Sequence, residues 1–283
     1  MALITDGGST KCDWVLLDAF GKIQFKTTTK GLNPTVLSKT ELSIRISENP
    51  TLKSVFDKVK ILDFYGAGCS TAVPTSDLRD VLQTLFSTAQ VSVREDTAAA
   101  VFAVTTEPGI VCILGTGSNS CYFDGSEIHT PIPALGYVLM DEASGNHYGR
   151  RLICDYFYKI MPKHLAAEFE RQFNLDADDI KTNLYKKANP NAYLASFAKF
   201  MFRPEISNDI YVQDAIKEGM SEFIKNRILT FENAKEVPIH FIGSIAYCSR
   251  ETIQKCLEEN NLQLGNIVKR FIDGLIDYYR RNI

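Results

Sequence analysis

The sequence lacks an excess of basic residues and lacks long apolar runs. Its 31 lysines and arginines are outnumbered by 34 aspartates and glutamates, for a formal net charge of −3. Without a basic excess the chain is poorly suited to neutralise a nucleic-acid backbone. No apolar run reaches the roughly 18 residues that span a bilayer, and the N-terminus has neither a basic region nor a cleavage site. We therefore expect a cytoplasmic protein that binds neither nucleic acid nor a membrane.

Clustered metal and redox ligands are also missing. The seven cysteines are odd in number and scattered, and no two form a C-x-x-C pair. The four histidines are equally dispersed. This spacing predicts reduced, mostly buried thiols and argues against a zinc or iron–sulfur site.

The two common glycine-rich nucleotide motifs are absent. There is no G-x-x-x-x-G-K-[ST], and no G-x-G-x-x-G opens a helix after a strand. Glycines lie instead in two loops, each between two apolar runs: ITDGGSTKCDWVLLD (residues 4–18) and CILGTGSNSCYFDG (residues 112–125). A β-meander and α/β segments follow each loop, which predicts two similar domains of ordinary size. Either loop alone would be read as a simple hairpin turn.

The loop at residues 6–11 has the composition of an anion-binding hairpin. Gly7 and Gly8 allow positive φ and leave room for a bulky oxyanion, and consecutive N–H groups then form a nest for it. Ser9 and Thr10 add hydroxyl donors, and Lys11 adds a charge that could equally face solvent. Asp6 cannot bind an anion, but it could hold Mg²⁺ through water. The second loop, Gly115–Ser118, lacks the carboxylate, and two such loops could clamp a polyphosphate for phosphoryl transfer.

Phosphoryl transfer to an alcohol also needs a base, and Asp96 is the best candidate. It stands where a predicted strand gives way to an alanine-rich helix, although an aspartate there could simply cap the helix, worth about 1 kcal/mol. Glu95 is a weaker choice because adjacent residues point in different directions. Asp141 and Glu142 form another acidic pair, which could also mark the start of a helix.

The apolar periodicity predicts alternating strands and helices. Strands are expected at 2–5, 13–18, 23–28, 59–64, 91–94, on both sides of the second loop, and at 238–242. Helices are expected at 38–47, 52–59, 77–87, from Asp96, at 154–160, 165–173, 212–228 and 245–259, and finally at about 264–281. Pro190 and Pro204 interrupt the helical region between about 146 and 231.

Five motifs in order carry a resemblance to a known family: DGGSTK, the Asp96 helix, GTGSNS, DEASG and FIGSIA. This order is similar to the N-acetylglucosamine kinase branch of the actin-like ATPase and sugar kinase superfamily, grouped with the BadF/BadG/BcrA/BcrD ATPase family. The resemblance covers nearly the whole chain. It implies an α/β fold with two ribonuclease-H-like domains, residues 1–108 joined by a C-terminal helix at 267–283, and residues 109–266, with ATP and sugar in the interdomain cleft.

The resemblance also implies a role for individual residues. Asp96 would accept the proton of the sugar 6-hydroxyl, and Asp6 would hold Mg²⁺. ATP would be bound by Gly7, Gly8, Ser9, Thr10, Lys11, Gly115, Thr116, Gly243 and Ser244. The sugar would be bordered by Asn33, Gly117, Ser118, Asn119, Gly136, Tyr137 and Asp141.

The implied activity is transfer of phosphate from Mg-ATP to the 6-hydroxyl of N-acetylglucosamine, and a homodimer is compatible with it. Glucosamine, N-acetylmannosamine and N-acetylmuramic acid stay open as acceptors. An iron–sulfur ATPase that activates a dehydratase and a nucleotide-binding regulator are alternatives from other classes. One departure bears on the sugar: the family segment Gly-Asp-Glu-Gly-Ser has Met140 and Ala143 here in place of its glycines. If both positions need positive φ, each replacement costs about 1 kcal/mol or more.

Overall fold

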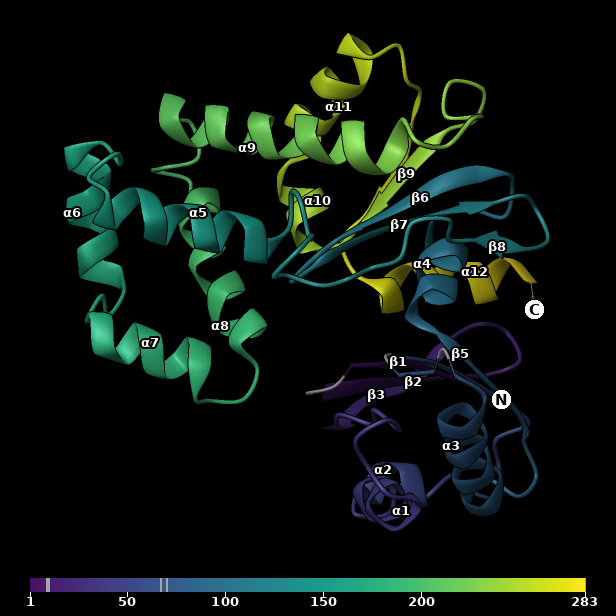
Figure 1. Cartoon of the computed structure of the whole chain (residues 1–283). Helices are drawn as coiled ribbons and strands as arrows, with labels where there is room; N and C mark the ends of the chain where they lie inside the picture. The colour runs from purple at the N-terminus through teal and green to yellow at the C-terminus, as the bar shows by residue number, and fades with distance from the viewer. Residues whose placement is uncertain (9–10, 67, 70, 283) are drawn as a thin grey trace. The chain divides into compact units, whose positions relative to one another are not determined.

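The computed structural model of the chain describes residues 1–8, 11–66, 68–69 and 71–282. The chain divides into two compact units. Unit 1 consists of Met1–Val104 together with Arg270–Ile283, and unit 2 consists of Thr105–Lys269. The last segment of the chain therefore returns to the first unit (Figure 1).

Unit 1 is built on one mixed sheet. Its described residues form five strands in the order β3-β2-β1-β4-β5. β2 is antiparallel to both β1 and β3, whereas β4 and β5 continue the sheet in parallel with β1. The predicted N-terminal meander is thus confirmed. The strands are β1 (Ala2–Gly7), β2 (Lys11–Leu17), β3 (Ile23–Lys30), β4 (Ile61–Gly66) and β5 (Gln90–Glu95).

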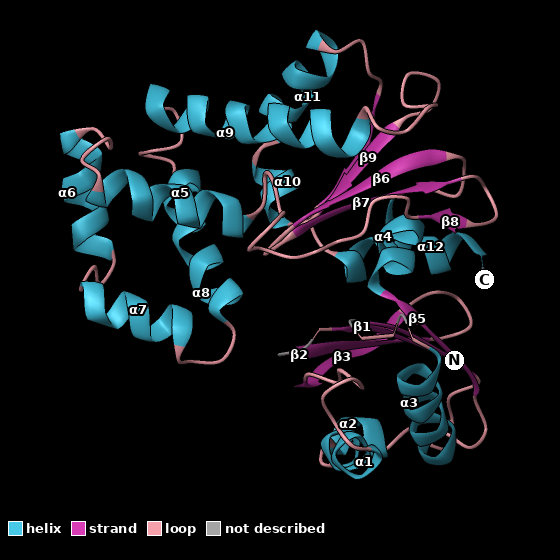
Figure 2. Ribbon diagram, viewed as in Figure 1, coloured by secondary structure: helices cyan, strands magenta, loops and turns pink. Residues whose placement is uncertain are grey.

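Helices cover both faces of this sheet (Figure 2). One face packs on α1–α3, where Trp14 and Phe64 of the strands share a fully buried core with Leu42 and Leu82 of the helices. The other face carries α4 and α12, which approach so closely that a methyl group on Gly274 would lie 2.4 Å from the carbonyl oxygen of Ala103. The helices are α1 (Lys39–Ser47), α2 (Pro50–Lys53), α3 (Ala72–Leu85), α4 (Asp96–Val104) and α12 (Phe271–Asn282).

Unit 2 repeats the sheet of unit 1. Its described residues also form five strands, in the order β10-β9-β6-β7-β8. When the strands of each unit are counted in chain order, both sheets read 3-2-1-4-5, with the second strand antiparallel to its neighbours. The predicted fold class is confirmed by this repetition. The strands are β6 (Gly109–Leu114), β7 (Ser118–Phe123), β8 (Ile128–His129), β9 (Ile239–Ile242) and β10 (Leu264–Val268).

Most of the remaining chain of unit 2 is helical, as the sequence predicts. Pro190 starts α8 at its first position, where proline is favoured, rather than interrupting a helix. Among the described residues no helix is both long and apolar enough to cross a membrane. The helices are α5 (Gly145–Phe157), α6 (Lys163–Gln172), α7 (Ala177–Tyr185), α8 (Pro190–Phe197), the 3₁₀ helix η1 (Ala198–Phe202), α9 (Ile210–Phe223), the π-helix η2 (Ile224–Ile228), α10 (Ser244–Cys248) and α11 (Arg250–Glu259).

Four predicted helices differ clearly from the observed ones, and one of them is α5, which was expected at 154–160 but begins at Gly145. The prediction of a helix from residue 264 is wrong, because 264–268 forms edge strand β10 beside β9 and α12 begins only at Phe271. The helix expected at 245–259 is broken at Ser249 into α10 and α11. The helix expected at 52–59 is the single turn of α2, which begins earlier because Asn49 caps Pro50–Lys53.

Candidate functional site

The first glycine loop is the tip of the β1–β2 hairpin. Ser9 and Thr10 lie outside the described residues. The N–H of Gly8 donates to the carbonyl oxygen of Lys11 at 2.9 Å, so this amide closes the hairpin. Neither Gly7 nor Gly8 adopts the left-handed backbone that the sequence analysis expected. Gly7 is needed for space, because a methyl group there would lie 2.4 Å from the Phe64 ring.

Three carboxylates of unit 1 lie near this hairpin. Asp6 faces Asp13 across the β1–β2 ladder, and Lys11 pairs with Asp13 at 2.7 Å. Burial, the largest cause, and the negative charges of Asp13 and Asp96 together raise the pKa of Asp6 to about 6, against a smaller opposing effect of Lys11. The positive charge of Lys11 is therefore already engaged by a neighbouring carboxylate.

Asp96 is the first residue of α4, directly after β5. The residue is open to solvent. The protein around the carboxylate still desolvates it, and this raises the pKa of Asp96, with Glu95 contributing in the same direction. Backbone N–H groups, that of Thr97 among them, oppose the shift by stabilising the ionised form.

Asp6 fits a magnesium ion that is held mainly by other ligands. Its carboxylate supplies the hard oxygen that Mg²⁺ prefers, and a cation beside it would offset the burial and repulsion that raise its pKa. Within the described ranges no three His, Cys, Asp or Glu side chains are placed to hold a metal. Mg²⁺ commonly takes one or two carboxylates and completes its shell with water and phosphate oxygens.

Asn33 lies against the loop that follows β4. Its Oδ1 accepts hydrogen bonds from the N–H and the hydroxyl of Thr35, at 2.9 and 2.6 Å. A methyl group on Gly68, which has φ +82°, would lie 2.1 Å from the same oxygen. Cys69 follows Gly68, and burial, with a further contribution from the charges of Asp96 and Glu95, raises the pKa of its thiol. Gly68 and Cys69 therefore connect Asn33 to the vicinity of Asp96, and the sequence analysis did not single out Gly68.

The second glycine loop joins β6 to β7, and its backbone is hydrogen-bonded to the first turn of α5. The N–H groups of Gly145 and Asn146 donate to the carbonyl oxygens of Gly115 and Thr116, at 2.8 and 2.9 Å. Gly117 needs to be small because a methyl group there would lie 2.7 Å from a carboxylate oxygen of Asp141. The first turn of α5 therefore holds two carbonyl groups of this loop in place.

The side chain of Asp141 also contacts the same loop. The residue is 6% exposed, and its carboxylate accepts hydrogen bonds from the N–H of Ser118 and from Nδ2 of Asn146, both at 3.0 Å. The hydroxyl of Ser118 and Oδ1 of Asn146 are buried without a hydrogen-bond partner in the described part of the chain. Asn119 uses its Oδ1 to accept from the N–H of Ser120.

The DEASG segment is strained at one of the two expected positions. Ala143 has φ +55°, so this replacement of a family glycine does carry the cost of a left-handed backbone, about 1–2 kcal/mol. The expectation for Met140 is wrong, because the left-handed residue beside it is Asp141, with φ +76°. The thioether of Met140 instead contacts the guanidinium of Arg227, which is 1% exposed.

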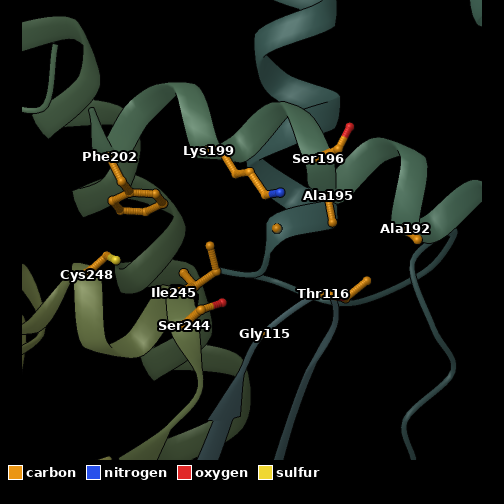
Figure 3. A pocket seen from close by; sticks show the side chains of 11 residues that line it. Gly115, Thr116, Ala192, Ala195, Ser196, Lys199, Phe202, Ser244, Ile245 and Cys248 are labelled. Carbon is orange, nitrogen blue, oxygen red and sulfur yellow. The ribbon is translucent and has the colours of Figure 1, made fainter. Parts of the chain in front are cut away.

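A cavity of about 370 Å³ opens beside the second glycine loop (Figure 3). It contains the predicted nucleotide residues Gly115, Thr116 and Ser244. Gly243, next to Ser244, has φ +123° and packs against the carbonyl oxygen of Leu114. Ile245, which also lines the cavity, belongs to the segment 243–246 that the resemblance places against the adenosine. The sequence analysis missed the remaining lining residues: Gly145, Ala192, Ala195, Ser196, Lys199, Phe202 and Cys248.

Gly136 and Tyr137 do not line this cavity. Tyr137 lines another one in unit 2, of about 580 Å³, with Arg150, Cys154 and Tyr185 among its neighbours. Gly136 has φ +80° and forms a turn, in which its carbonyl oxygen accepts from the N–H of Met140. Their predicted contact with a sugar stays a prediction.

Comparisons with known proteins give full-length matches among solved structures. No family model matches the chain, and no curated protein does. A Porphyromonas gingivalis protein named "Putative N-acetylglucosamine Kinase" is 32% identical, with a TM-score of 0.92 over 100% of this chain and 99% of that one. A Chromobacterium violaceum protein of the same name is 16% identical, with a TM-score of 0.73 over 98% of both chains.

A third solved structure shares the fold at greater distance. It is a ROK-family glucokinase from Streptomyces griseus in complex with glucose and AMPPNP, 14% identical, with a TM-score of 0.56 over 98% of this chain and 97% of that one. The first match combines 32% identity with coverage of all of this chain and 99% of the other. The chain therefore belongs to the family of the Porphyromonas gingivalis protein, a sugar kinase family with the actin-like two-domain fold.

Proposed function

We propose that the protein transfers the γ-phosphoryl group of ATP to the 6-hydroxyl of N-acetylglucosamine, as a member of the BadF/BadG-related kinases. The observation that carries the proposal is the repeated hairpin loop: the first copy has three carboxylates beside it, and the second borders a 370 Å³ cavity. One copy alone would be an ordinary turn. The 32% identity to the Porphyromonas gingivalis protein supports the acceptor.

The roles follow from the chemistry of each group. The cavity at Gly115 and Thr116 receives the nucleotide. Asp96 accepts the proton of the attacking hydroxyl, since an accessible carboxylate with a raised pKa is the stronger base. Asp6 would hold Mg²⁺ through water, and the ion would supply positive charge next to the transferred phosphoryl group. Because such transfers depend on positioning and charge stabilisation, the bracing of the second loop by Asp141 supports catalysis without contact with the reacting atoms.

A panel of acceptors tests the proposal. We expect Mg-ATP to release ADP in a sugar-dependent manner, with the highest kcat/KM for N-acetylglucosamine among N-acetylglucosamine, glucosamine, N-acetylmannosamine, N-acetylmuramic acid and glucose. The matched control is 6-deoxy-N-acetylglucosamine, which lacks the accepting oxygen and should inhibit competitively without releasing ADP. ADP release with none of the sugars would refute the proposal, and a preference for another acceptor would refute its sugar.

A further inference from the structure

The nucleotide cavity of unit 2 is lined mainly by apolar and hydroxyl-bearing side chains. Phe202, Ile245 and Cys248 gather at one end, and Thr116 of the glycine loop stands at the other (Figure 3). The side chain of Lys199 extends between them, away from Phe202 and toward Ala195 (Figure 3). Lys199 is the single charged residue among those that line the cavity in the described part of the chain.

The glycine loop by itself offers little positive potential to an anion. It has no basic side chain, and the N–H of Gly115 is already bonded to the carbonyl oxygen of Gly117. The N-terminus of α5 is used as well, because its first two amides hold loop carbonyls and the N–H of His147 donates to Ser144. A positively charged side chain at this cavity would therefore add to the attraction of a polyphosphate.

Lys199 is placed to supply that charge. It projects from η1, whose neighbouring residues Ala198, Phe200 and Met201 are 1%, 0% and 0% exposed and fix the helix in the core. Lys199 itself is exposed and forms no ion pair with any residue that the structure describes. A lysine that is anchored at its backbone and free at its amino group acts as a point charge for phosphate.

We propose that Lys199 binds the phosphates of the nucleotide and orients them toward the loop at Gly115 and Thr116, while the base occupies the end formed by Phe202, Ile245 and Cys248. This inference rests on the proposed kinase function and assigns a further residue to its nucleotide site. The charge of Lys199 should therefore increase the affinity for ATP, and it should not change the affinity for adenosine, which enters the same cavity without phosphates.

The test compares ATP and adenosine binding to the wild type, Lys199→Met and Lys199→Arg by calorimetry. A charge-assisted hydrogen bond of this kind corresponds to a loss of about ten- to a hundredfold in ATP affinity for Lys199→Met. Adenosine affinity should stay the same, and Lys199→Arg should recover most of the loss. Equal ATP affinity in Lys199→Met and the wild type would overturn the inference, as would a parallel loss of adenosine, which would make Lys199 a residue that shapes the cavity.

A second measurement uses the wild type alone and does not depend on a folded variant. ATP should slow acetylation of Lys199 by an amine-specific reagent, and it should leave Lys225, an exposed lysine of η2, unaffected. Equal rates at Lys199 with and without ATP would contradict the inference even in an active kinase. A wild type that binds neither ATP nor adenosine would instead refute the proposed function, and the role of Lys199 with it.

Discussion

Replacing Asp96 with asparagine should lower kcat for N-acetylglucosamine by about 10²- to 10⁴-fold, the usual contribution of a general base. Asparagine has the shape of aspartate and keeps an oxygen that can accept from backbone N–H groups at the start of α4, but it cannot take the proton of the hydroxyl. ATP and sugar affinities should therefore change little. Steady-state kinetics together with calorimetry separate the two effects.

Glu95 offers a matched control, because it is the adjacent carboxylate. Its Oε2 accepts from the hydroxyl of Thr97 at 3.2 Å, and Glu95→Gln keeps an acceptor in that place. We expect Glu95→Gln to retain kcat at its plateau to within a few-fold. A full rate in Asp96→Asn, or an equal loss in Glu95→Gln, would mean that Asp96 is not the base.

The same pair of residues gives a pH dependence with a defined sign. Asp96 acts only when ionised, so activity must fall as pH drops through its raised pKa, which puts the acid limb above the range of an ordinary aspartate. Glu95 contributes to that raised pKa. Glu95→Gln should therefore move the acid limb of the kcat profile to lower pH, and an unchanged or upward-shifted limb would contradict this assignment.

The sequence predicted the two hairpin loops because their signal is local. Glycines and hydroxyls between apolar runs mark a turn wherever they occur, and their repetition predicted the two similar sheets. The C-terminal prediction failed because Ile267 has helical spacing with Phe271 and Leu275, yet it pairs with Phe241 across the β9–β10 ladder. That pairing is long-range and leaves no mark in the spacing.

Only some of the residues that line the nucleotide cavity could be predicted from the sequence, for the same reason. Thr116 and Ser244 carry loop signatures, but Lys199 and Phe202 come from an ordinary helical stretch that tertiary packing alone brings to the loop. One signal was present in the sequence and unused. Gly145 and Gly149 are four residues apart, so they share one face of α5, and two glycines on a helix face allow a second helix to approach closely.

That close approach leads to the second large effect, at Gly149. A methyl group there would lie 1.9 Å from the carbonyl oxygen of Leu194 in α8, so Gly149→Ala forces backbone to move. Alanine favours an isolated helix over glycine by about 1 kcal/mol, yet overpacking against an immovable neighbour should dominate. We expect a net loss of about 3 kcal/mol in the free energy of unfolding. Nucleotide affinity should fall as well, since α8 contributes Ala192, Ala195 and Ser196 to the cavity.

Substitutions at Gly145 test whether a loss of stability comes from steric overlap with α8 or from a general sensitivity of α5 to substitution. A methyl group on Gly145 would meet the Cβ of Ala195 at 2.8 Å, an obstacle that Ala195→Gly removes. Ala195→Gly should therefore restore part of the stability that Gly145→Ala loses, and it should do nothing for Gly149→Ala, whose obstacle is backbone. Arg150→Ala, at an exposed position of the same helix, should stay within about 0.5 kcal/mol of the wild type. Denaturant unfolding measures the free energy of unfolding of each variant. If Gly149→Ala were as stable as the wild type, α5 and α8 could not be in the close contact described.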